Sequence, residues 1–169
     1  MTRFPRYNHP GKLLDTRKGR CGEWANAFAL CCVSMGWETR YCVDFTDHVW
    51  CEVFDPSGGG RGGGGCWVHC DPCENAYDAP LMYESGWGKK LTYVFGVTHE
   101  EITDVTRRYT RKWTREVLPR RTEAPSEEWL RLTLTILNSL RQASLPSERV
   151  QQLRVRATIE EAELNALSQ

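Results

Sequence analysis

The chain has 169 residues, and its 22 basic and 22 acidic residues give a formal net charge of zero. This length suits one domain whose core covers roughly two-thirds of the surface of the unfolded chain. The two charge signs are mixed, so the composition indicates neither a nucleic acid nor an anionic membrane as partner. No run of about 18 apolar residues is present, and the N-terminal segment lacks the apolar stretch of a signal peptide. We therefore expect a soluble, cytoplasmic protein.

Eight cysteines invite a disulfide framework, but such frameworks are typical of small secreted chains. Cys31 and Cys32 are adjacent within a helical pattern, so we expect most of the thiols to be reduced and buried. Cys70 and Cys73 have the spacing of a zinc or redox motif. A structural zinc site commonly uses two such pairs, and a redox motif needs a strand-to-helix setting, whereas Cys70 ends a strand pattern. The sequence therefore predicts no metal site.

Residues 1–20 are polar and interrupted by prolines and glycines, so we expect them to lead into the main domain. Residues 22–35 are rich in alanine, leucine and aromatic residues, which would lie on nearly all sides of a helix. This pattern predicts a buried helix that ends at Gly36. Apolar and polar residues alternate over 37–45, which predicts a strand. Residues 47–54 predict a second strand, with His48, Trp50, Glu52 and Phe54 on one face and Val49, Cys51 and Val53 on the other.

The glycine-rich segment 55–65 predicts a flexible turn, and no helix with phosphate-loop spacing follows it. CWVHC (66–70) predicts a third strand that leads into an Asp-Pro pair. LTYVFGV (91–97) predicts a fourth strand.

The C-terminal part of the chain has helical signals. Thr98 with Glu101 is typical of a capping box and predicts a helix to about Tyr109. Ser126 and Ser147 each follow a proline and begin helical patterns, which we interpret as an antiparallel helical hairpin with one apolar stripe. The whole chain therefore predicts the α+β class, with a core helix on an antiparallel sheet and a helical hairpin at the C-terminus.

Three residues in this order form the set that a cysteine hydrolase needs: Cys21 at the start of the first helix, and His48 and Asp71 on successive strands. The positive end of a helix favours a thiolate. A histidine can take the thiol proton and later protonate a leaving nitrogen, and an acid can orient that histidine. Each residue alone is as well explained by structure: a buried thiol, a strand histidine and a turn aspartate.

Four motifs in this order, GRCGEWAN, RYCVDFTDHVWCEV, HCDPCEN and GWGKKLTYV, closely resemble the transglutaminase-like core of the cytoplasmic peptide:N-glycanases. The resemblance runs from about Phe4 to about Tyr109, and the C-terminal helices are similar to the segment that follows this core in the family. It implies a papain/transglutaminase-like α+β core, with a catalytic part over 21–118 and a C-terminal helical segment over 119–169. Residues 1–20 then lead into that core.

The resemblance also implies a reaction. The family hydrolyses the amide between asparagine and the first N-acetylglucosamine of N-linked glycans on misfolded glycoproteins, through a thioester. By motif, Cys21 is the nucleophile, His48 the general base and then acid, and Asp71 the orienting carboxylate.

Four further residues match positions near the family's sugar-binding cleft: Trp50, Glu52, Glu74 and Trp87. Taken as residues, Trp50 and Trp87 suit either a groove that stacks on sugar rings or the core, which is the commoner place for tryptophan.

The resemblance implies further parts and partners. Family members carry an upstream region in which two CxxC pairs bind a structural zinc and which forms the other wall of the cleft. We expect that region, and an oxyanion-stabilising tryptophan, to be absent from this chain, which then has no cofactor of its own. Expected partners are misfolded N-glycoproteins and a ubiquitin-receptor shuttle protein of the proteasome pathway.

Two alternatives remain open at this point. One is a truncated, inactive binding or adaptor module of the same fold that acts in glycoprotein degradation through its C-terminal helices. The other is a transglutaminase-like hydrolase that cleaves a peptide or isopeptide bond.

Overall fold

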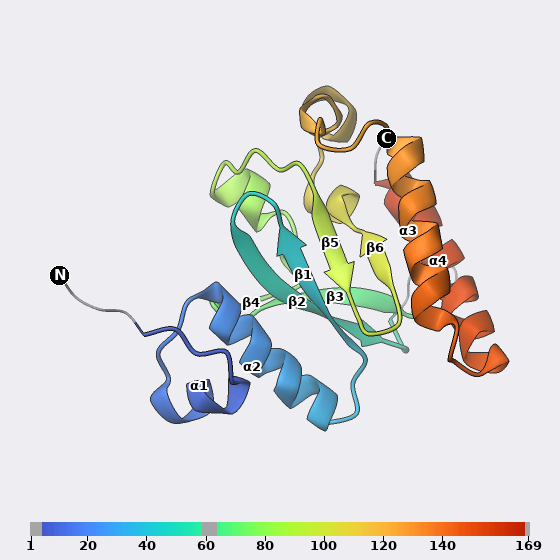
Figure 1. The fold of residues 1–169 in the computed structure, drawn as a ribbon. Coiled ribbons are helices and arrows are strands. Elements are labelled where there is room, and N and C mark those ends of the chain that lie inside the picture. Colours follow the sequence, from blue (N-terminus) through green and yellow to red (C-terminus); the bar gives the residue numbers. More distant parts are fainter. Residues whose placement is uncertain (1–4, 59–63, 168–169) are drawn as a thin grey trace.

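The structure, a computed structural model, describes residues 5–58 and 64–167 (Figure 1). At its centre is a six-stranded sheet in the order β4-β3-β2-β1-β5-β6, with every neighbouring pair antiparallel. The strands are β1 (Thr39–Asp44), β2 (His48–Asp55), β3 (Cys66–Asp71), β4 (Ala76–Tyr77), β5 (Val94–Val97) and β6 (Ile102–Asp104). The helices are α1 (Pro10–Thr16), α2 (Cys21–Ser34), α3 (Glu127–Gln142) and α4 (Ser147–Ala166). Helices around an antiparallel sheet confirm the predicted α+β class.

The helix α2 packs against β1 and β2, and α1 packs against α2 (Figure 1). Successive residues of a strand point to opposite faces of the sheet, and the Cys51 thiol donates to the Ala25 carbonyl of α2 at 3.2 Å. The face that carries Cys51 is therefore the one that α2 covers. His48, Trp50 and Glu52 alternate with Cys51 and belong to the other face.

That second face is covered by aromatic and apolar side chains from the segments after β3. A buried cluster consists of Cys42, Trp50, Tyr83, Leu91, Val94, Val105 and Tyr109. Trp50 stacks on Tyr83 with ring centroids 4.3 Å apart, and its indole N–H donates to the Tyr109 hydroxyl at 2.7 Å. Because a buried indole needs a hydrogen-bond partner, this contact explains how Trp50 can be fully buried.

Most of the predicted elements are confirmed, with shifts of a few residues at their ends. The predicted helix from Thr98 to Tyr109 is wrong. The Thr98 hydroxyl accepts from the backbone N–H groups of Glu100 and Glu101, which closes a turn, and β6 then pairs with β5. Threonine bonds to nearby backbone in turns as well as at helix starts, so the local pattern did not distinguish the two. Of the predicted glycine-rich turn, residues 59–63 lie outside the described residues.

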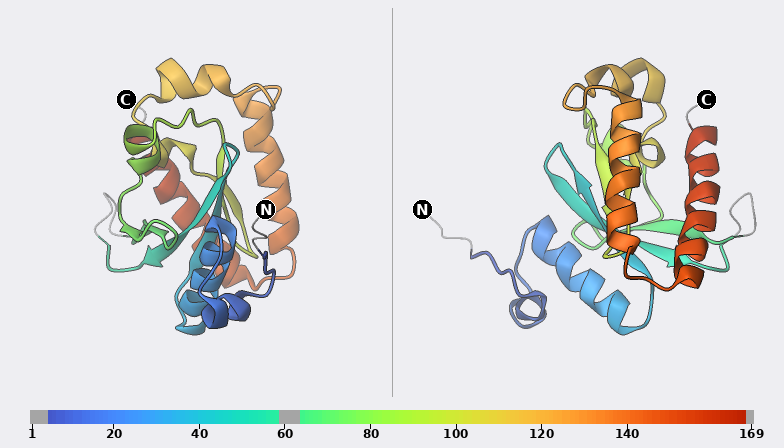
Figure 2. Two further views of the ribbon diagram at one scale, coloured as in Figure 1. Left: turned by 90° about the vertical axis from the view of Figure 1, so that its left-hand side faces the viewer. Right: turned by 45° about the vertical axis from the view of Figure 1, so that its right-hand side comes forward.

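The C-terminal helices lie on the side of the molecule away from α1 and α2 (Figures 1 and 2). They run antiparallel, and Ser126 caps α3 by accepting from the Trp129 N–H at 3.0 Å. The apolar stripe predicted for the hairpin is largely exposed on α3. Its larger apolar side chains face outward and are exposed, namely Trp129, Leu132, Ile136, Leu137 and Leu140. Only Leu130 of α3 is buried, whereas α4 buries Leu153 and Leu164.

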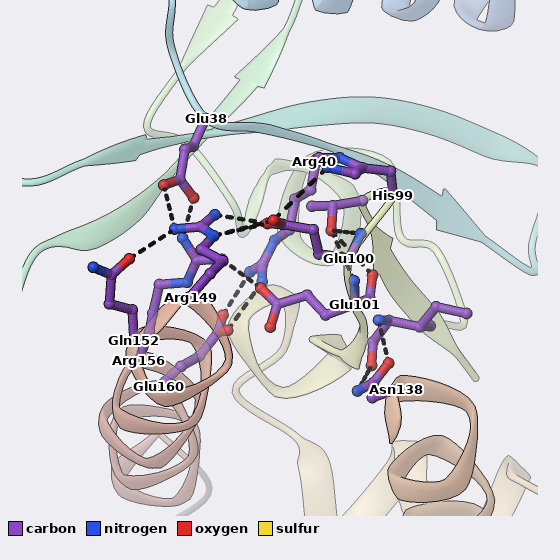
Figure 3. Close-up of polar contacts among 12 residues, drawn as sticks. Glu38, Arg40, His99, Glu100, Glu101, Asn138, Arg149, Gln152, Arg156 and Glu160 are labelled. Carbon is purple, nitrogen blue, oxygen red and sulfur yellow. Dashed lines mark hydrogen bonds and ion pairs between the residues drawn. The ribbon is translucent and has the colours of Figure 1, made fainter. Parts of the chain in front are cut away.

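Polar contacts attach both helices to the sheet (Figure 3). The Asn138 side chain accepts from the Ile102 N–H and donates to the Ile102 carbonyl, which holds α3 against β6. On α4, Arg149 pairs with Glu38 and Glu100. The short segment before β1 and the β5–β6 turn are therefore bound to the same helix.

A buried ion cluster also joins α4 to the sheet. Arg40 of β1 and Arg108 both pair with Glu52 of β2 and with Glu160 of α4. Arg40 lies against Gly96, where a Cβ would be only 2.7 Å from its Cδ atom, so a glycine on β5 leaves the space that the arginine occupies. Two positive and two negative charges balance in this cluster, which lets them be buried together.

Candidate active site

His48 and Asp71 are in direct contact. The His48 Nε2 and Asp71 Oδ2 atoms are 2.7 Å apart, and both side chains are buried. β2 and β3 pair with Cys51 opposite Cys70, so continuing the register by one pair places Asp71 opposite Trp50 and diagonal to His48. Diagonal neighbours on one face are within reach of long side chains. The contact predicted from two successive strands is thus present.

The Asp71 carboxylate is held by four donors. Its Oδ2 atom also accepts from the Tyr83 hydroxyl at 2.7 Å, and its Oδ1 atom accepts from the backbone N–H groups of Cys73 and Glu74. Burial raises the pKa of Asp71, but the hydrogen bonds from His48 and Tyr83 outweigh burial and leave this pKa below its ordinary value. Asp71 is therefore an ionised acceptor for the His48 ring.

Cys21 is the first residue of α2 and is half-buried. The helix start lies against β2, because a side chain at Gly22 would meet Val49, the residue after His48, at 4.0 Å. Backbone N–H groups in the first turn of a helix have no intrahelical partner, and Cys21 lies in that turn. No hydrogen bond joins Cys21 to His48 within the described part of the chain. Catalytic hydrogen bonds are often long before a substrate binds.

The start of α2 is fixed by Glu23. Its carboxylate accepts from the Arg20 N–H at 3.1 Å and pairs with Arg6. Burial raises the pKa of Glu23, yet the hydrogen bonds from Arg6 and from the Arg20 backbone leave it below its ordinary value. An ionised acid in the first turn stabilises the helix that carries Cys21.

Cys73 is a second thiol near the site. Cys73 is exposed as a residue, but partial desolvation of its sulfur and the neighbouring carboxylates of Glu74 and Asp71 raise the pKa of Cys73 to about 11. Cys73 therefore stays a protonated thiol at neutral pH, and it is a poor nucleophile.

Aromatic rings surround the His48 imidazole. The centroids of Trp87, Tyr83 and Trp50 lie 5.0, 5.3 and 5.7 Å from that of His48. Lys89 anchors the segment that carries Trp87, since its ammonium donates to the Asp44 carboxylate and to the Thr46 carbonyl.

The four residues expected at a sugar cleft divide into two pairs. Trp87 is 43% exposed beside His48, and Glu74 is exposed in the turn that binds Asp71. Trp50 and Glu52 are both fully buried, so neither offers a surface to a sugar. The expectation that these two line the cleft is corrected. Trp50 packs against the His48 ring, and Glu52 lies in the ion cluster.

His69 belongs to the site's hydrogen-bond network, although no sequence motif assigns it a role. Its Nε2 atom lies 2.7 Å from the Tyr83 hydroxyl, which in turn binds Asp71. The strand register was the available signal, because His69 and Asp71 fall on one face of β3.

Within residues 5–58 and 64–167, no group of three or more histidine, cysteine or acidic side chains could hold a metal ion. Of the predicted Cys70–Cys73 pair, Cys70 is buried and Cys73 is exposed. No described helix is both long enough and apolar enough to cross a membrane.

The arrangement suits nucleophilic attack by a thiolate. Because Asp71 binds Nε2, the imidazole atom left for the Cys21 proton is Nδ1. Such a histidine can accept the thiol proton and return it to a leaving nitrogen, while the carboxylate stabilises the imidazolium and fixes its tautomer.

Two protein-family models match the chain. One is described as the transglutaminase-like superfamily and matches residues 1–72. The other is described as the Rad4 transglutaminase-like domain and matches residues 40–165, most of the chain.

Among curated proteins, the chain is similar to several named peptide-N(4)-(N-acetyl-beta-glucosaminyl)asparagine amidase. It is 54% identical over 95% of its length to the protein of Gallus gallus, and 52% identical over 94% to that of Homo sapiens. It is 44% identical over 96% to that of Yarrowia lipolytica. The chain spans 24%, 23% and 43% of these three relatives, respectively, so it matches only one part of each.

Proposed function

Since the chain belongs to the family of Rad4 transglutaminase-like domains, we propose that Cys21, His48 and Asp71 are the catalytic triad of a peptide:N-glycanase. The 2.7 Å contact between His48 Nε2 and Asp71 Oδ2, with Cys21 at the start of a helix against the same strand, carries the proposal. The relatives named as asparagine amidases support the choice of substrate. The bond cleaved is the amide between the asparagine side chain and the first N-acetylglucosamine of an N-linked glycan.

In the proposed reaction, His48 Nδ1 takes the Cys21 proton and the sulfur attacks the asparagine carbonyl carbon. His48 returns the proton to the amide nitrogen, the carbon–nitrogen bond breaks, and the glycan leaves as a glycosylamine. Water, deprotonated by His48, then attacks the thioester, which leaves an aspartate and restores the thiol. Asp71 remains ionised throughout and binds Nε2–H.

Glu74 and Trp87 are the proposed contacts for the sugar. Trp87 presents a partly exposed ring beside His48, where the C–H face of a sugar can stack. Glu74 is exposed three residues after Asp71 and can accept from sugar hydroxyl groups.

By resemblance to the family, the proposal places this activity in the cytoplasm, on misfolded glycoproteins. A structural zinc and the second wall of the cleft would then come from an upstream region of the family's longer proteins. Because one oxyanion donor can be worth about 10²–10³ in rate, comparing the chain with a version extended at its N-terminus tests whether the family's upstream region supplies such a donor.

The test is release of N-glycans from a denatured glycoprotein by the wild-type chain and by Cys21→Ala, beside the N-terminally extended version. We expect loss of release in Cys21→Ala with an unchanged circular dichroism spectrum. Cys31→Ala is the matched control, since Cys31 is an exposed thiol on the same helix. Equal release by Cys21→Ala and the wild type would refute the nucleophile assignment.

A second candidate function is binding of a partner through α3. The exposed apolar side chains of this helix support it. By resemblance, this partner would be a ubiquitin-receptor shuttle protein. If the wild-type chain is inactive, even in its extended version, but binds denatured glycoprotein or such a protein, the adaptor function replaces the enzyme. If it cleaves a peptide or isopeptide substrate and releases no glycan, the triad stands with another substrate.

A further inference from the structure

Tyr83 lies between two buried residues that face each other across it. Its hydroxyl oxygen is 2.7 Å from His69 Nε2 and 2.7 Å from Asp71 Oδ2. All three side chains are buried, with exposed fractions of 0% for Tyr83 and 1% for His69 and Asp71. The Tyr83 hydroxyl therefore makes its hydrogen bonds in the interior with these two partners.

The direction of each hydrogen bond follows from the chemistry of the groups. An ionised Asp71 can only accept, so the single Tyr83 proton points to Oδ2. His69 must then donate from Nε2–H to the Tyr83 oxygen. This tautomer leaves His69 Nδ1 as an acceptor, and the Ala79 N–H donates to that atom at 3.3 Å.

The protonation states of His69 and Tyr83 agree with these hydrogen-bond directions. Burial lowers the pKa of His69 below its ordinary value, so the ring is neutral at neutral pH. Burial and the Asp71 carboxylate raise the pKa of Tyr83, so its hydroxyl keeps the proton that it donates.

We propose that Tyr83 and His69 are positioning residues for the triad, which act on His48 through Asp71. Tyr83 comes from the helical turn Met82–Gly86, whereas Asp71 ends β3 and His48 begins β2. The hydroxyl fills the second acceptor direction of Oδ2 while the backbone of the following turn holds Oδ1. The carboxylate therefore cannot rotate away from His48 Nε2.

This inference rests on the proposed function, because a positioning role presupposes that His48 and Asp71 act on a substrate. It also makes a claim that holds without any substrate. In the free protein the Nε2–H tautomer of His48 should depend on the Tyr83 hydroxyl.

The ring and the hydroxyl of Tyr83 must be separated in the experiment, since the ring also stacks on Trp50. Tyr83→Phe removes only the hydroxyl. Tyr93→Phe is the matched control, because Tyr93 is equally buried and its hydroxyl binds the Ala124 N–H rather than the triad. His69→Gln keeps an N–H donor toward Tyr83, and His69→Leu removes it.

Two measurements are made on each variant of this chain: kcat and KM for glycan release from a denatured glycoprotein, and the ¹⁵N chemical shifts of the His48 ring. Partners that orient functional side chains, such as those of metal ligands, are typically worth about 10- to 100-fold in activity. We expect kcat to fall about tenfold in Tyr83→Phe with KM unchanged, and His48 to lose its single tautomer. His69→Leu should likewise lower kcat and disturb the His48 tautomer. His69→Gln should keep most of the wild-type kcat and tautomer.

The inference is overturned if Tyr83→Phe matches Tyr93→Phe in both kcat and His48 tautomer while the wild type is active. If the wild type releases no glycan, even in its N-terminally extended version, the proposed function fails, but the ¹⁵N shifts still decide the inference. If Tyr83→Phe and His69→Leu both unfold, the His69→Gln variant decides it: a normal kcat and tautomer there support the donor role, and a loss of both refutes it.

Discussion

Glu160 offers the sharpest test of how the C-terminal helix supports the site. Its carboxylate is 4% exposed and accepts from Arg40 at 2.9 and 2.5 Å and from Arg108 at 2.6 Å. Glu160→Gln leaves two buried guanidinium groups against the single carboxylate of Glu52, and it turns an amide N–H₂ toward a cation. Breaking a buried ion pair from one side costs about 3–5 kcal/mol.

This cost is large against the total stability of a domain, about 5–15 kcal/mol. At roughly 2–4 °C per kcal/mol for a chain of this size, the melting temperature should fall by about 6–20 °C. Urea unfolding followed by tryptophan fluorescence measures the free energy directly. Glu161→Gln, the exposed neighbour on α4, should change it by less than about 0.5 kcal/mol.

The effect should also depend on pH. Burial raises the pKa of Glu160, but Arg40 and Arg108 more than offset burial and leave the pKa below its ordinary value. A carboxyl with a lowered folded-state pKa stabilises the fold above its unfolded value, about 4.3, and loses that contribution as pH falls through the folded value. The difference between wild type and Glu160→Gln should thus be full at pH 7 and shrink below about pH 4. A Glu160→Gln variant as stable as Glu161→Gln at pH 7 would refute the reasoning.

Two further predictions concern the site itself. Asp71→Asn keeps the shape but permits the wrong His48 tautomer, so single-turnover glycan release should slow by about 10⁴-fold, as in other triads; a loss below tenfold contradicts an orienting carboxylate. Trp87→Ala removes the partly exposed ring beside His48 and should raise KM about 3- to 10-fold, the worth of one aromatic contact, with little change in kcat. Trp37→Ala, which removes an exposed ring from the segment before β1, is its control, and an equal KM for both variants would exclude a sugar contact at Trp87.

Much of the fold could be predicted because it is encoded locally. Alternation of apolar and polar residues predicted β1, and Ser126 predicted the start of α3 through the hydrogen bond it makes. The pairing of His48 with Asp71 could be anticipated because the side-chain period of a strand is two. Two successive antiparallel strands then bring such residues together.

Errors arose where a residue's partner is distant in the chain. Glu52 resembled a cleft residue, but Arg40 and Arg108 bind it, and the fourth charge comes from Glu160 on α4. Local pattern cannot show a partner supplied by another element. The helix predicted from Thr98 was wrong for a related reason, because the turn at Thr98 is fixed by the pairing of β6 with β5.

The sequence by itself therefore determined the order of elements, the class of fold and the three candidate catalytic residues, because these depend on local periodicity and on motif. Only the tertiary structure decided which side chains face the site and which lie beneath it. Burial depends on packing between distant segments, as it does for Trp50 against His48 and for Tyr83 between His69 and Asp71. The same physics left the apolar residues of α3 exposed, since its other face is the one bound to β6.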